Sequence, residues 1–460
     1  MQGSPDSAQS EAANYGRRAS LLSIGVGITG LITYLYFAIA SHNLSSEDYG
    51  QIAVLWSAVF ITVSTLQRPV EQLLSRTVSD HIAHDESYRH PVRVSATIQL
   101  GVSLTFVVVA LALKAPIQDD LLDGNEVLYW IGVGAVAAYG ASYFARGFLA
   151  GSHRLTLYAL LIISESVSRT AFPFAVALGI ASGQTAVAIG IVAAPTLSLI
   201  VVPFAFLGRG DETIADEAAD PGRDRSTTGA QSIGFAEGGG FAAAVFLIML
   251  SEQTFLNAGP LLVNATAGAA AAGFIFNVLM IARAPLQLFQ AVSTSLLPHL
   301  TRLRAEGAED DYRASVRVTI LAIAGFAALV GVAVAVAGPQ LMQIAFGENF
   351  TYHRSDLLIV TAGMGLYLCA ATLNQAALAQ GQLRQAAACW VACALVFVAW
   401  TAIPLVSDDF LRVELGYLGA AAILCAALYT LYRRPATGSV GPGSTDEMEL
   451  RLAAADEGGP

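Results

Sequence analysis

The residues of this chain that could do chemistry are charged and amide side chains placed inside long apolar stretches. Glu165 and Arg169 share one stretch at i, i+4, the favourable order for an ion pair on a helix. Glu252 lies in another stretch with no basic residue beside it in the sequence. Charges inside a membrane are costly and usually face a cavity or a partner. The first two residues therefore predict either a self-neutralising structural pair or the lining of a water-filled cavity.

Glu252 is the more open case. A lone carboxylate at that depth is either neutral or turned toward water. It predicts either a site linked to a coupling proton or sodium ion, or a capped structural group. No Ser/His/Asp group, phosphate-cradling glycine loop or pair of carboxylates has a spacing that carries catalysis. We therefore expect a protein that is not an enzyme and that holds no metal or cofactor.

Two arginines form a second group. Arg68 and Arg283 lie deeper than the other basic residues apart from Arg169, and each is close to a proline in the sequence. Arginine can hold two oxygens of a phosphate at once. With Asn277 and Gln287 nearby, the pair predicts a site for an anionic headgroup. The alternative is that both arginines anchor the ends of spans and reach water through their long side chains.

The elements that must position these residues are membrane helices. About 20 apolar residues cross the roughly 30 Å of hydrocarbon in a bilayer. The chain is 55% hydrophobic and 13% charged, whereas soluble chains carry about 25% charged residues. Suitable windows lie near residues 21–40, 51–67, 94–113, 128–145, 156–180, 185–207, 236–258, 268–292, 318–337, 357–378, 386–405 and 413–432. The sequence predicts an all-α polytopic membrane protein with twelve transmembrane helices.

Basic residues orient this threading. With the amino terminus in the cytoplasm, nearly all of the 24 Lys and Arg residues fall at the inner connections, Arg146 among them. Lys114, Arg354 and Arg412 fall outside. Because cytoplasmic loops are rich in Lys and Arg, we expect both termini in the cytoplasm. The formal net charge of −11 comes from acidic tails and loops, which indicates no nucleic-acid partner.

The spans divide into two halves. We expect an N-terminal lobe over 1–207, an acidic cytoplasmic linker over 208–235, a C-terminal lobe over 236–434 and a disordered cytoplasmic tail over 435–460. A linker at the midpoint of the spans is typical of duplicated lobes related by an axis along the membrane normal. A Gly-x-x-Arg turn recurs after the fourth and tenth spans, at 151–154 and 381–384, as duplication predicts.

Several short motifs resemble one family when taken together. They are SSEDYG at 45–50, RGFLAG at 146–151, AGF at 272–274, RAP at 283–285, LLP at 296–298 and FGENF at 346–350. In this order they resemble motifs of the polysaccharide (O-antigen/oligosaccharide) flippases of the multidrug/oligosaccharidyl-lipid/polysaccharide exporter (MOP) superfamily. The chain departs from that pattern at Ser46, where the family often has proline.

The resemblance implies two six-helix lobes around a central cavity that opens to alternate sides of the bacterial cytoplasmic membrane. The implied substrate is a polyprenyl-diphosphate-linked oligosaccharide drawn from the membrane lipids. A drug/cation antiporter of the same superfamily is the main alternative, although the first span at 21–40 has no Asp or Glu. A polytopic glycan ligase needs a larger outer loop than residues 114–127 supply, and a pure assembly scaffold needs no charge at membrane depth.

Overall fold

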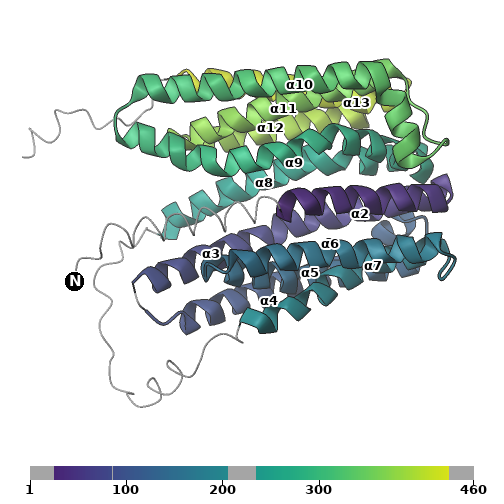
Figure 1. The fold of residues 1–460 in the computed structure, drawn as a ribbon, viewed down its shortest axis with the longest axis horizontal. Coiled ribbons are helices and arrows are strands. Elements are labelled where there is room, and N and C mark those ends of the chain that lie inside the picture. Colours follow the sequence, from purple (N-terminus) through teal and green to yellow (C-terminus); the bar gives the residue numbers. More distant parts are fainter. Residues whose placement is uncertain (1–24, 85, 206–234, 435–460) are drawn as a thin grey trace, which may run out of the picture.

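The computed structural model describes residues 25–84, 86–205 and 235–434, and throughout these residues it contains helices and no strand (Figure 1). The first half holds a helix over Gly25–Asn43, α2 (Ser46–Leu66), α3 (Arg68–Ala83), α4 (Arg89–Ala112), η1 (Pro116–Leu121), α5 (Glu126–Gly151), α6 (Leu155–Ala177), α7 (Gly183–Ser198) and η2 (Leu199–Ala205). The second half holds α8 (Phe235–Ala267), α9 (Ala269–Ala305), α10 (Glu309–Phe346), α11 (Arg354–Ala379), α12 (Leu383–Ala402) and α13 (Asp409–Tyr432). The proposed linker and tail lie outside the described residues.

The helices match the predicted spans. In the described part of the chain, 11 helices are long and apolar enough to cross a membrane. The remaining predicted span, 268–292, begins as the shorter apolar helix Ala269–Ile281 and belongs to α9. The all-α polytopic fold with its transmembrane helices is therefore confirmed.

Some helices are longer than the hydrocarbon requires. The span Ser46–Ala83 and α10 each contain 38 residues, which at 1.5 Å per residue is about 57 Å. The first of these breaks at Gln67 because Pro69 has no N–H and clashes with the preceding turn. The helix restarts as α3 with Pro69 in its first turn, where proline is tolerated. At this length both helices exceed the roughly 30 Å of hydrocarbon in a bilayer.

The helices pack as two lobes. In the described residues α3 to α7 pack on one another and on α2, while α8 to α13 pack on one another. The main links between the lobes run from α2 to α8 and α9, and from η1 to α8. Figure 1 shows the lobes side by side, with the N-terminal lobe below the C-terminal one.

The lobes meet most closely at one end of the bundle, the end that bears the turns at 43–46, 267–269 and 346–354. A Cβ on Gly50 would lie 1.8 Å from the carbonyl oxygen of Ala269, so only glycine permits this contact. Aromatic rings join the lobes nearby, with the centroids of Phe37 and Phe276 4.5 Å apart. We call this the tight end.

The opposite end carries most of the described arginines, including those of α3 and of the turn between α9 and α10. We call it the basic end. Here α3 packs on α2, α4 and α5 of its own lobe. In Figure 1 the far end of α3 and the α9–α10 turn lie well apart. The lobes are therefore joined at the tight end and diverge toward the basic end.

Candidate functional site

The C-terminal lobe holds a half-buried arginine that forms no ion pair among the described residues. Arg283 in α9 donates from Nη1 to Oδ1 of Asn257 in α8 at 3.2 Å. Its Nε and Nη2 are buried and have no hydrogen-bond partner among the described residues. The phenol rings of Tyr417 and Tyr367 influence it electrostatically. A buried guanidinium with unused N–H groups calls for an explanation, and an anion supplies one because such hydrogen bonds are charge-assisted.

A short amide chain on α8 orients this arginine. Asn257 Nδ2 donates to Gln253 Oε1 at 3.0 Å, so Oδ1 of Asn257 is the atom turned toward Arg283. Both amide side chains are buried. Because they stand one turn apart on the same helix, α8 presents a polar stripe to α9.

Glu252 and Arg68 act on each other across the lobe boundary. Glu252 of α8 is half-buried and forms no ion pair among the described residues, and Arg68 of α3 is the charged group that acts on it. Arg68 also interacts electrostatically with Glu71 and Tyr143 in its own lobe. The hydroxyl of Tyr367 interacts electrostatically with the charges of Glu252, Arg283 and Arg68. The charges of these three predicted residues therefore all reach Tyr367 of α11, in the C-terminal lobe.

The amides predicted beside Arg283 do not both join it. Asn277 is fully buried at the tight end, where its Oδ1 accepts from the hydroxyl of Tyr49 in α2. Six residues turn a helix by about 240°, so Asn277 and Arg283 leave α9 in different directions. The side chain of Gln287 lies outside the described residues.

The N-terminal lobe contains a three-membered ion cluster. Glu165 in α6 accepts from Arg169 Nη2 at 2.9 Å through Oε1, and from both Arg146 and Ser142 through Oε2. The side chains of Arg169, Glu165 and Arg146 are 3%, 5% and 11% exposed. The expected pair of Glu165 and Arg169 is present. The expectation that Arg146 lies at a polar connection is wrong, because α5 carries it to a buried carboxylate.

Aromatic faces complete this cluster. The guanidinium of Arg169 lies over Trp56 at 4.7 Å from the ring centroid, and that of Arg146 lies over Tyr143 at 4.4 Å. Such stacking stabilises a desolvated cation by about 2 kcal/mol. Tyr158 donates to Glu71 Oε1 at 2.8 Å. The cluster is thus held by ion pairs, rings and a hydroxyl, and it leaves Arg68 as the neighbouring arginine without an ion pair among the described residues.

Sequence comparisons place the chain near proteins of mycobacteria. No family model matches it. Uncharacterized proteins of Mycobacterium bovis and Mycobacterium tuberculosis are 24% identical over 372 residues, which is 78% of this chain and 79% of theirs. This similarity covers most of both chains.

Solved structures identify the fold. An inward-facing multidrug resistance MATE family transporter of the MOP superfamily matches with a TM-score of 0.64 at 10% identity, covering 95% of this chain and 99% of that one. An outward-facing one matches with a TM-score of 0.60 at 16% identity, covering 90% and 94%. A MOP transporter from Pyrococcus furiosus, described as having a binding pocket of reverse polarity, matches with a TM-score of 0.54 at 15% identity, covering 91% and 96%. The chain has the fold of the MATE transporters of the MOP superfamily.

Proposed function

We propose that the protein is an exporter that moves a polyprenyl-diphosphate-linked oligosaccharide across the bacterial cytoplasmic membrane by alternating access. The observation that carries the proposal is Arg283, whose guanidinium has a neutral partner and, among the described residues, two buried nitrogens with no acceptor. Arg68 offers a second cation from the other lobe. A diphosphate presents several acceptor oxygens, so two arginines at a lobe boundary suit it. The shared transporter fold supports the general class.

The orientation follows from charge. The positive-inside rule turns the basic end to the cytoplasm and leaves both termini there. The lobes are then closed on the outer side by the contact between Gly50 and Ala269. Between them we infer a central cavity that receives the headgroup from the inner leaflet. Rocking of the lobes about α2, α8 and α9 would carry that headgroup to the outside.

Glu252 gives this cycle a coupling group. It lies across the lobe boundary from Arg68, and opposite charges there favour approach of the lobes. An anionic headgroup bound to Arg68 would lie near the carboxylate of Glu252, and the two negative charges would repel each other. A proton or sodium ion on Glu252 would remove that repulsion. Glu252→Gln is expected to uncouple export from the ion gradient and to leave binding of the headgroup in place.

The test is the binding of a polyprenyl diphosphate to purified protein, with surface glycan as the cellular readout. A charge-assisted hydrogen bond contributes about 1.5–3 kcal/mol, so Arg283→Ala should weaken binding by roughly 10- to 100-fold and stop glycan export. Arg283→Lys keeps the charge and should restore part of both. Arg317→Ala, on the exposed surface of α10, is the matched control. Normal binding and export by Arg283→Ala at normal protein levels would place the anion site elsewhere.

The drug/cation antiporter remains a second candidate, favoured by the unpaired carboxylate of Glu252. This function requires the carboxylate of Glu252 and does not require the guanidinium of Arg283. Extrusion of an organic cation should then depend on Glu252 and be indifferent to Arg283→Ala. Measuring cation efflux and glycan export with both variants separates the two functions.

A further inference from the structure

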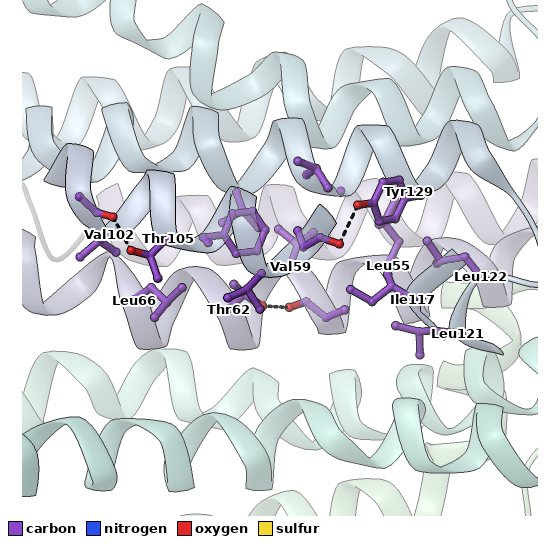
Figure 2. A pocket seen from close by; sticks show the side chains of 18 of the residues that line it. Leu55, Val59, Thr62, Leu66, Val102, Thr105, Ile117, Leu121, Leu122 and Tyr129 are labelled. Carbon is purple, nitrogen blue, oxygen red and sulfur yellow. Dashed lines mark hydrogen bonds between the residues drawn. The ribbon is translucent and has the colours of Figure 1, made fainter. Parts of the chain in front are cut away.

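A groove of about 760 Å³ lies on the side of the N-terminal lobe, apart from the charged residues (Figure 2). Its walls come from α2, α4 and α5, and η1 lies at one end. We call it the α4 groove and define it by Leu55, Leu66, Ile98, Val109, Leu121 and Tyr129. It falls within the range of ligand sites in proteins, about 300–1,000 Å³. It therefore has room for part of a molecule.

The chemistry of the walls favours an apolar occupant over a polar one. The hydroxyls on the walls already donate to backbone carbonyls, each at 2.8 Å: Thr62 to Ala58, Thr105 to Gly101 and Tyr129 to Ala110 (Figure 2). The other lining side chains are apolar. A polar group placed here would lose its hydrogen bonds to water and find only hydroxyl oxygens that already donate their protons. The groove fits hydrocarbon.

The shape suits one extended chain. From Leu55 to Leu66 along α2, and from Ile98 to Val109 along α4, the wall rises by about 16 Å at 1.5 Å per residue. This is close to half of the roughly 30 Å of hydrocarbon in a bilayer. Ile98 and Val109 are 40% and 48% exposed, so the groove opens toward the side that faces lipid. A chain from one leaflet can enter sideways and lie along α4.

The groove also lies beside the seam between the lobes. Its wall residue Leu121 accepts, through its carbonyl oxygen, a hydrogen bond of 3.0 Å from Asn264 Nδ2 of α8 in the other lobe. The same helix α2 that forms one wall is followed at once by Arg68, which faces the lobe boundary. A lipid can therefore place its headgroup at the boundary and its chain outside it.

We infer that the α4 groove holds the hydrocarbon chain of the transported lipid while the headgroup occupies the lobe boundary. This inference rests on the proposed function, because it gives that substrate a second site. The division is physically sensible, since the chain never has to enter the polar region and the headgroup never has to enter lipid. The chain site adds affinity in proportion to chain length up to the length of the groove.

Gly101 offers a sharp test. It lines the groove, and a Cβ added to it would meet no atom within 4 Å. Gly101→Trp therefore adds a bulky side chain at the groove wall, and its Cβ meets open space. Gly331 of α10 is equally open, so Gly331→Trp is the matched control. The probes are undecaprenyl diphosphate, the short geranyl diphosphate and phosphatidylglycerol, each titrated into purified protein in detergent.

The inference expects Gly101→Trp to weaken binding of undecaprenyl diphosphate at least 10-fold and to weaken binding of geranyl diphosphate less, because the shorter chain buries less hydrocarbon in the groove. Gly331→Trp should change neither, and Arg283→Ala should weaken both. Equal affinity of wild type and Gly101→Trp for the long probe overturns the inference, as does loss of phosphatidylglycerol alone. Failure of the proposed function gives a different result: geranyl diphosphate binds the wild type and Arg283→Ala with the same affinity. A protein that binds neither diphosphate overturns both.

Discussion

The buried cluster around Glu165 makes the most quantitative stability prediction. One carboxylate serves two guanidiniums, those of Arg146 and Arg169, and all three side chains are nearly or fully buried. Removing one partner of a buried ion pair costs about 3–5 kcal/mol because the other charge is left uncompensated. The order of the variants therefore depends on which charge each one strands.

Arg169→Ala leaves no buried charge without a partner, because Glu165 still pairs with Arg146. It loses the stacking on Trp56, which is about 2 kcal/mol for a desolvated cation. Glu165→Gln keeps the shape of the side chain but strands two guanidiniums, so it should cost the full 3–5 kcal/mol or more. The double variant Arg169→Ala with Glu165→Gln leaves Arg146 alone without its carboxylate and should still be less stable than Arg169→Ala. A simple pair of Glu165 and Arg169 predicts the reverse, with the double variant the more stable.

The assay is the fraction of protein that stays monodisperse in detergent after heating, at one heating rate for all variants because unfolding of such proteins is often irreversible. Arg76→Ala, on the exposed face of α3, is the control and should match the wild type. The expected order of midpoints is wild type, Arg169→Ala, the double variant, then Glu165→Gln. A double variant that survives to a higher temperature than Arg169→Ala would refute the three-membered cluster.

Two further predictions concern orientation and the closed contact. The free cysteines, which lie in helices, are first replaced. Cysteines introduced at Asp120 and Ser407 should then react with impermeant thiol reagents from outside intact cells, and one at Glu306 should not. The reverse labelling pattern would mean that the protein has the opposite orientation in the membrane. Gly50→Ala puts a Cβ against the Ala269 carbonyl, so it should open the tight end, raise labelling of a cysteine placed there and slow export. In the control Gly27→Ala the added Cβ meets no atom within 4 Å, and this variant should behave as wild type. Unchanged labelling in Gly50→Ala would show that the lobes close elsewhere.

The membrane helices could be predicted from the sequence because hydropathy reports directly on the hydrocarbon. The predicted spans 128–145 and 357–378 lie within α5 and α11. The parts of helices that extend beyond the apolar spans were harder to predict from the sequence. The span predicted at 51–67 continues as α3 to Ala83, since a helix that enters water becomes polar and loses the apolar signal while keeping its backbone hydrogen bonds.

The site was predictable where its residues share a helix. Glu165 and Arg169 are one turn apart, so their pairing follows from helical periodicity. Arg146 stands 19 residues before Glu165 on another helix, and Tyr49 stands 228 residues before Asn277. Such contacts depend on how helices pack, which spacing does not report. The one signal for Arg146 was its place in the motif at 146–151, whose Gly147 allows α5 to approach Glu71 of α3 closely.

The central claim is that the protein carries a lipid-linked diphosphate glycan from one leaflet to the other. The direct measurement is translocation of a fluorescent polyprenyl-diphosphate oligosaccharide in liposomes that contain the purified protein, read by quenching of the label from outside. The account predicts movement with the wild type and the Arg317→Ala control, and none above empty liposomes with Arg283→Ala. Wild-type liposomes that leave this lipid in place but move an organic cation in a Glu252-dependent way would contradict the account.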